Sequence, residues 1–182
     1  MNRWPNLFSL AVKGEFDKNK FDKQIKGISF ETSLGSNVLH FAVLGGCVES
    51  VRYFIDHGIN VNAKNHFGET PLHWCCKEGN IAIALELLNA GARVDIKDCD
   101  NNLPIHWAAE YEQNEILFKL LQLGSSSTAE NAEGYTPMHL AIVNNSTKCI
   151  ALLNEHISTK SISIASPRIM SIHSKCIAIS VQ

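Results

Sequence analysis

The chain has 182 residues, enough for one domain with a substantial core and too few for two large ones. Hydrophobic residues make up 45% and charged residues 19%, a composition that excludes wholesale disorder. Apolar runs are far shorter than the roughly 20 residues that a membrane-spanning helix needs. We expect no Sec-type export signal, because the apolar stretch near the N-terminus is too short for a signal-peptide core.

The charge is unevenly distributed along the chain. Seven basic and fourteen acidic residues fall within 32–156, so the middle is acidic, whereas both flanks carry net positive charge. Phosphate binding needs a basic face, so the acidic middle disfavours nucleic acid as a partner. The six cysteines are scattered without zinc or C-x-x-C spacing, which indicates a reducing, intracellular compartment such as cytoplasm or nucleus.

Residues 1–31 are predicted to form helices that cap one end of the fold. The segment 7–14 has the same pattern of residue types as 39–46, where the first full repeat of the chain begins its first helix. A lysine-rich stretch at 13–26 follows, and it suits an outer helix that faces solvent. We therefore expect a degenerate N-terminal capping unit.

From residue 32 onward the sequence repeats every 33 residues. Three independent sets of residues share this period: four histidines, a glycine set with one asparagine, and a second glycine set. These are His40, His73, His106 and His139; Gly35, Gly68, Asn101 and Gly134; and Gly58, Gly91 and Gly124. They define four repeats, at 32–64, 65–97, 98–130 and 131–156.

Each repeat is predicted to hold two antiparallel helices and a turn. In the second repeat, Thr70 can cap a helix that starts at Pro71, where no backbone N–H is needed. Gly79 ends that helix, an apolar stripe at 81–88 forms the next one, and Gly91 ends it in the left-handed conformation. One unit cannot bury both of its faces alone, so neighbouring units must stack into a continuous core.

The motifs of these units resemble those of the ankyrin-repeat family. The resemblance rests on Thr70-Pro71-Leu72-His73, Leu103-Pro104-Ile105-His106-Trp107-Ala108-Ala109, Thr136-Pro137-Met138-His139-Leu140-Ala141 and Leu87-Leu88-Asn89-Ala90-Gly91-Ala92. It covers 32–156 and implies an all-α ankyrin-repeat solenoid of stacked helix-turn-helix units with short β-turn fingers. It further implies a monomeric module for protein–protein interaction that acts as an adaptor or inhibitor, with no cofactor and no catalytic residues.

The third repeat departs most from the family pattern. Leu103 stands where a capping threonine is expected, and three serines at 125–127 replace the usual Ala-x-Val. In the fourth repeat, Ile157 stands where the next glycine would fall. We expect the junction between the third and fourth repeats to be the weakest part of the array.

The resemblance places a partner on the concave face formed by the fingers and the ends of the first helices. The partner-binding positions are His66, Phe67, Glu69, Lys77, Glu78, Asp100, Asn102, Glu110, Tyr111, Glu133, Tyr135 and Asn144. Their aromatic rings would supply apolar area, and their carboxylates would surround it with negative charge. We expect a protein partner with a basic surface, and neither nucleic acid nor membrane.

Three sets of residues in the repeats invite a more specific interpretation. The four histidines lie one repeat apart, roughly 10 Å when helices pack, which is too far for one metal ion. The resemblance implies that each histidine instead forms hydrogen bonds with backbone and threonine and ties its turn to the next.

Cys75 and Cys76 could form a thiol nucleophile, but they occupy positions of small buried alanines, so we expect a packing role. Trp74 and Trp107 fit either framework packing or partly exposed binding anchors.

Residues 157–182 form a tail in which serine alternates with isoleucine and no acid occurs. Alternation favours a strand, but an isolated strand has nothing to pair with, so we expect partial disorder. Two alternatives stay open, namely a segment folded back over the last repeat and the remnant of a longer repeat protein. The second of these gives another functional hypothesis, in which the array is the targeting portion of a catalytic protein or a bacterial effector delivered into host cells.

Overall fold

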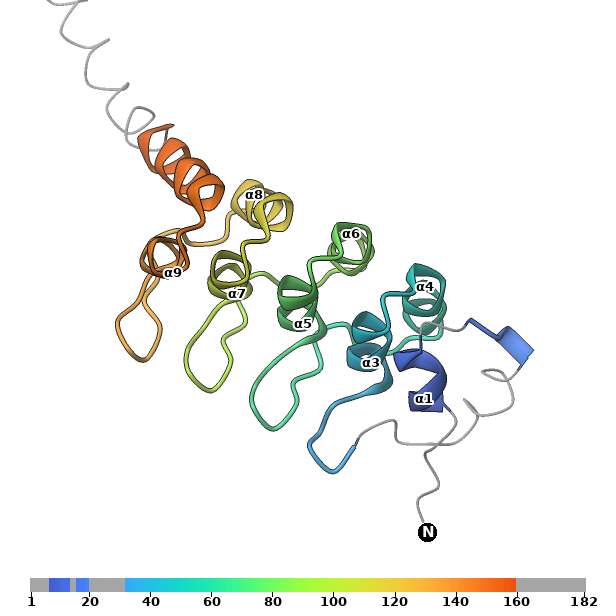
Figure 1. Ribbon diagram of the computed structural model, residues 1–182. Helices are drawn as coiled ribbons and strands as arrows, with labels where there is room; N and C mark the ends of the chain where they lie inside the picture. Colours follow the sequence, from blue (N-terminus) through green and yellow to red (C-terminus); the bar gives the residue numbers. More distant parts are fainter. Residues whose placement is uncertain (1–6, 14–15, 20–31, 160–182) are drawn as a thin grey trace, which may run out of the picture.

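The helices of the computed structural model form two rows (Figure 1), and the structure describes residues 7–13, 16–19 and 32–159. The inner row consists of α3 (Val38–Leu44), α5 (Pro71–Glu78), α7 (Pro104–Glu110) and α9 (Pro137–Val143). The outer row consists of α4 (Val48–Asp56), α6 (Ile81–Asn89), α8 (Asn114–Gln122) and a helix at 147–159. Finger-like loops extend from the inner row on the side away from the outer helices.

Each finger ends in a tight turn that requires a left-handed residue. In the second repeat, the Gly68 N–H donates to the Asn65 carbonyl at 2.9 Å, and Gly68 has φ +75°. Asn101 takes the same position in the third repeat with φ +61°, which asparagine tolerates better than most side chains. Neighbouring fingers are joined through their backbones, for example from the Cys99 N–H to the Phe67 carbonyl at 2.8 Å. The glycine register therefore fixes the finger shape.

The recurrent histidines join consecutive repeats. His73 accepts the Thr70 N–H on Nδ1 at 3.1 Å and donates from Nε2 to a carbonyl of the next finger. His40 and His106 bond the carbonyls of Glu69 and Ala129 in the same way, at 3.2 Å and 3.0 Å. For these three histidines the bonds confirm the structural role that the resemblance implied.

Burial keeps the three inner histidines neutral. Desolvation lowers the pKa of His40 to about 4, and it also lowers the pKa of His73 and of His106. A neutral ring suits each site, because Nδ1 faces an N–H donor while Nε2 faces a carbonyl acceptor.

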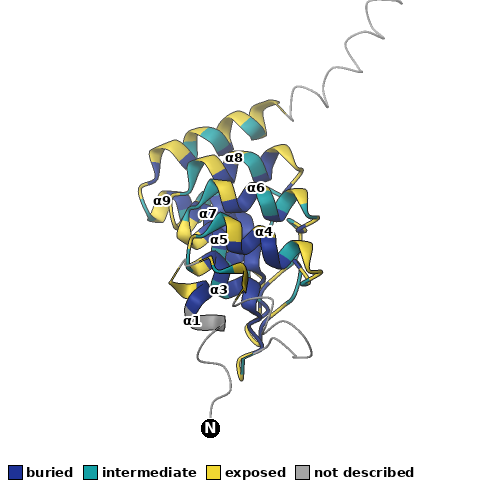
Figure 2. Cartoon of the chain, turned by 90° about the vertical axis from the view of Figure 1, so that its right-hand side faces the viewer, coloured by how far each residue is buried: buried dark blue, intermediate teal, exposed yellow. Residues whose placement is uncertain are grey.

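The core lies between the two rows and between successive repeats (Figure 2). At one end, α1 (Leu7–Val12) packs against α3 and buries Leu10 and Ala11, in the place expected for a capping helix. Most of the lysine-rich stretch that follows lies outside the described residues. Among the helices that the structure describes, none has the length and apolar character needed to cross a membrane.

The last outer helix continues past the boundary expected at residue 156. Residues 157–159 are helical and so extend the fourth repeat instead of beginning the tail. The three preceding outer helices end at left-handed glycines, whereas Ile157 disfavours that conformation and lets the helix continue. Residues 160–182, for which the sequence predicts partial disorder, lie outside the described residues.

Candidate functional site

The fingers and inner helices enclose a groove centred on Trp107, with a volume of about 460 Å³. Its lining combines apolar side chains with five carboxylates: Phe67, Glu69, Asp98, Cys99, Asp100, Asn102, Trp107, Glu110, Tyr111, Asn131, Ala132, Glu133 and Leu140. Neither lysine nor arginine occurs among these lining residues. The groove is therefore an acidic surface with an aromatic floor.

A smaller hollow of about 240 Å³ adjoins this groove toward the N-terminal repeats. Its lining residues are Leu44, Glu69, Trp74, Lys77, Glu78 and Trp107. Because Glu69 and Trp107 line both hollows, the two hollows form one surface along the four inner helices and the fingers of the second, third and fourth repeats. We call this combined surface, defined by the lining residues above, the concave groove.

The structure brings together nine of the twelve residues expected at the partner site. The other three do not line the concave groove. His66 and Tyr135 are exposed on their fingers, and the Asn144 side chain donates to the Leu140 carbonyl at 3.0 Å at the end of α9. These nine residues therefore share one surface, and their role in binding stays a prediction.

Negative charge accumulates around Glu110. Partial desolvation raises the pKa of the carboxyl of Glu110, an exposed residue, Lys77 counteracts this, and the nearby charges of Asp98 and Glu133 raise the pKa further. The Lys77 ammonium, which lines the smaller hollow, lies 5.7 Å from the centre of the Tyr111 ring and forms a cation–π contact with it. Glu110 thus lies among like charges from Asp98 and Glu133, with Lys77 as the opposing charge.

A family model for ankyrin repeats, built on three copies, matches residues 8–98 and 90–164 of the chain. The chain belongs to the ankyrin-repeat family. The match confirms the all-α ankyrin solenoid, and ankyrin repeats generally mediate protein–protein interaction through modules that are typically non-catalytic. The curated proteins contain no match to the chain.

Asp98 and Asn131 belong to this ankyrin groove but were missed from the sequence. The buried Asp98 carboxylate accepts the backbone N–H groups of Asp100 and Asn102 at 2.9 Å and 2.8 Å. The Asn131 side chain accepts the N–H groups of its own finger in the same way. Thr32, Asn65, Asp98 and Asn131 recur every 33 residues just before the turn, and this register was the available signal.

The two tryptophans pack in the framework and are also partly exposed in the concave groove, and their role as binding anchors stays a prediction. The Trp107 indole N–H donates to Asp98 at 3.0 Å, and its ring lies edge-on to His73 at 5.8 Å. Trp74 donates to Glu69 at 2.7 Å. Both rings are half-buried and line the concave groove, so they hold the ankyrin framework and present part of their surface.

Glu69 is partly a framework residue of the ankyrin array. Besides the Trp74 indole, its carboxylate accepts the Asn65 side-chain amide at 2.7 Å. A substitution at Glu69 would therefore disturb the finger as well as the charge of the groove. Asp100, Glu110 and Glu133 are exposed and are better positions for testing charge alone.

Cys75 and Cys76 lie in the core, where the ankyrin pattern places small buried residues. The Cys75 thiol donates to the Asn80 carbonyl at 3.2 Å. Burial raises the pKa of Cys75 to about 12 and that of Cys76 well above its ordinary value. Both thiols stay protonated at neutral pH, which fits the packing role and not a nucleophile.

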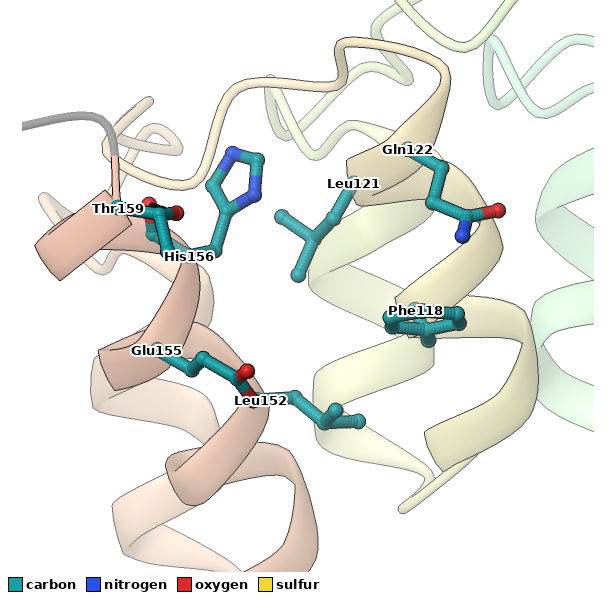
Figure 3. A pocket seen from close by; sticks show the side chains of 7 residues that line it. All are labelled: Phe118, Leu121, Gln122, Leu152, Glu155, His156 and Thr159. Carbon is teal, nitrogen blue, oxygen red and sulfur yellow. Dashed lines mark hydrogen bonds between the residues drawn. The ribbon is translucent and has the colours of Figure 1, made fainter. Parts of the chain in front are cut away.

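A further hollow lies in the outer row of the ankyrin array, between α8 and the helix at 147–159 (Figure 3). Its volume is about 140 Å³, and its lining residues are Phe118, Leu121, Gln122, Leu152, Glu155, His156 and Thr159. Its volume is less than a third of that of the groove around Trp107, and its lining lacks the cluster of carboxylates. We therefore take the concave groove as the candidate site.

Proposed function

We propose that this ankyrin array binds a partner protein in the concave groove and that the partner contributes a basic segment. The observation that carries the proposal is the set of five carboxylates that line the larger hollow around Trp107 and Tyr111, against one basic residue, Lys77, in the adjoining smaller hollow. A lysine or arginine side chain of the partner would meet opposite charge and an aromatic face together. Binding is the activity, so the chain serves as an adaptor or an inhibitor.

The chemistry of the groove favours a cation over a neutral side chain. A cation over an aromatic ring contributes about 0.5 kcal/mol at exposed sites and about 2 kcal/mol when desolvated. Lys77 beside Tyr111 shows that an ammonium group fits against this ring. The pKa of Glu110 is raised by partial desolvation and by its acidic neighbours. A partner cation would therefore stabilise the charged form of this carboxyl.

The proposal is tested by reversing charge inside and outside the groove. The groove variant carries Asp100→Lys, Glu110→Lys and Glu133→Lys, three exposed positions in the lining. The matched control carries Asp56→Lys, Glu115→Lys and Glu155→Lys, three exposed positions on outer helices. Both variants receive the same change in net charge.

Affinity capture with mass spectrometry compares wild type, groove variant and control, after circular dichroism has verified their folding. We expect wild type and control to retain the same proteins and the groove variant to lose them. Because the attraction is electrostatic, retention by wild type should also weaken as salt is raised. Equal retention by all three forms would exclude the concave groove as the partner site.

A further inference from the structure

The last repeat exposes side chains whose equivalents are fully buried in the first three repeats. Ile142 is 54% exposed, whereas Val43, Cys76 and Ala109 in the same register have no exposed surface. Met138 is also partly exposed, although Leu39, Leu72 and Ile105 in its register are fully buried. Among the described residues, α9 differs from the other inner helices in lacking a following inner helix. These side chains therefore mark the face on which the next unit would stack.

The same face continues onto the last outer helix and carries a polar group. Ile150 is partly exposed, while Val51, Ala84 and Leu117 in its register are fully buried. His139 accepts the Thr136 N–H on Nδ1 at 3.1 Å, yet its Nε2 meets no partner among the described residues. In the first three repeats this nitrogen bonds a carbonyl of the following finger. We call Met138, His139, Ile142 and Ile150 the C-terminal face.

The two ends of the array differ. At the N-terminal end, α1 covers α3 and buries its own Leu10 and Ala11 there. At the C-terminal end, the described residues provide no such cover. A terminal repeat needs a polar outer surface for solubility, and the C-terminal face does not have one.

We propose that residues 160–182 of this chain lie across the C-terminal face and cover it. They follow directly on the last outer helix, which contributes Ile150 to the face. In the first two repeats the carbonyl that the histidine bonds lies 29 residues further on, and in the third it lies 23 residues further on. Counting the same distances from His139 reaches Arg168 and Ile162, both within 160–182.

The length and composition of the segment suit this cover. An internal repeat needs the 21 residues from Gly58 to Glu78 to pass from the end of one outer helix through the next inner helix, and 160–182 provides 23. The segment has no Thr-Pro-x-His motif, so it covers the face without forming a fifth ankyrin repeat. Isoleucines alternating with serines, as at Ile162 and Ile164, place apolar side chains on one side of an extended chain.

A segment of the same chain should occupy the C-terminal face more readily than a second copy of the chain, because it is tethered beside the face. A segment tethered by a short linker reaches an effective concentration of about millimolar, above ordinary protein concentrations in solution. Serines on the opposite side of the segment would replace the apolar face with a polar surface.

Thiol labelling of the full chain at two adjacent positions tests the proposal. Ile142→Cys lies on the C-terminal face, and Val143→Cys lies beside it in the register of the exposed groove residues Lys77 and Glu110. Without a cover the two positions should react at similar rates, because Ile142 and Val143 are 54% and 67% exposed. A cover in place nine-tenths of the time should slow the reaction at position 142 by about tenfold relative to position 143. Mass spectrometry of labelled peptides reads each rate while the native cysteines stay in place.

A second variant assigns the protection to the segment. Ile162→Ser with Ile164→Ser changes only residues outside the described core, and it should bring the rate at position 142 up to that at position 143. Equal rates at both positions in the unmodified segment would overturn the proposal. So would slow labelling that persists in the double-serine variant, slow labelling that depends on protein concentration as expected for a second copy, or protection that appears at Phe118→Cys in the outer hollow instead.

Discussion

The Nε2 nitrogen of His73 lies 3.2 Å from the carbonyl oxygen of Asn102, a residue 29 positions further along the chain. This bond links the start of one inner helix to the finger of the next repeat, and His40 and His106 make equivalent links. Because the carbonyl can only accept, Nε2 must carry the proton. Nδ1 is then the acceptor for the backbone N–H at the helix start.

The neutral histidines predict that the array loses stability between pH 7 and pH 5. His40 has a pKa of about 4 in the folded chain, against 6.5 as its ordinary value, so the unfolded chain binds more protons in this range. For His40 alone, the free energy of unfolding should fall by about 2 kcal/mol from pH 7 to pH 5. Urea unfolding at pH 7 and at pH 5 measures this change in the free energy of unfolding. His40→Gln should be less stable at pH 7 and less sensitive to pH, and an equal response in both proteins would contradict the assignment.

Ser125 predicts a stabilising substitution at the junction that the sequence marks as weak. Its hydroxyl is buried and finds no hydrogen-bond partner among the described residues, and Ala92 is buried in the same register one repeat earlier. Ser125→Ala should raise the free energy of unfolding by about 1 kcal/mol, because the buried hydroxyl is removed. The reciprocal change Ala92→Ser should lower it by a similar amount. Thermal melting of wild type, Ser125→Ala and Ala92→Ser measures both effects. A melting temperature for Ser125→Ala below that of wild type would refute this explanation.

Glu112 predicts a second gain in stability. It has φ +59°, in the register where Gly46 and Gly79 have φ +70° and +79°. Glu112→Gly should raise the free energy of unfolding by about 0.5 to 1 kcal/mol, since the strain of a left-handed side chain exceeds the entropy that glycine loses. Glu112→Ala removes the same charge but keeps the strain, so it should leave stability nearly unchanged. Chemical denaturation that gives equal gains for both would point to charge instead of conformation.

The cysteines predict a sharp division in thiol reactivity. Cys99 is exposed, whereas Cys75 and Cys76 are buried and their pKa values are raised by burial. At pH 7.5 to 8, roughly the range in which ordinary thiols begin to react, an alkylating reagent should modify Cys99 within minutes and leave the buried pair intact until the chain unfolds. Peptide mass spectrometry follows each site. Rapid modification of Cys75 in the folded chain would show that the inner helices open far more readily than their packing indicates.

The sequence predicted most of the fold because the repeat constrains local conformation at many positions. Turn glycines, prolines at helix starts and the histidine register each act within a few residues, so spacing alone located them. Contacts between repeats were harder to predict. Leu103 cannot cap its helix through its side chain, yet the His106 ring accepts its N–H at 3.0 Å and holds the helix start.

The groove was predicted only in part for the same reason. Phe67, Glu110 and Tyr111 were found because they occupy variable positions of the repeat, but their distances depend on stacking. Asp98 looked like an ordinary finger residue, and its bond to Trp107 spans nine residues and two structural elements. The double role of Glu69 likewise becomes visible only when its partners Trp74 and Asn65 are placed around it.

Photo-crosslinking from two matched phenylalanines would locate the partner on the array. Phe67 lines the concave groove and is 53% exposed, and Phe118 lines the outer hollow and is 48% exposed. Each is replaced in turn by p-benzoylphenylalanine, and crosslinked partner peptides are sequenced by mass spectrometry at low and high salt. If the partner binds in the concave groove, position 67 should crosslink to a lysine- or arginine-rich segment, with a yield that falls as salt is raised. Crosslinks formed at position 118 alone, or at position 67 to a segment without basic residues, would contradict the proposal.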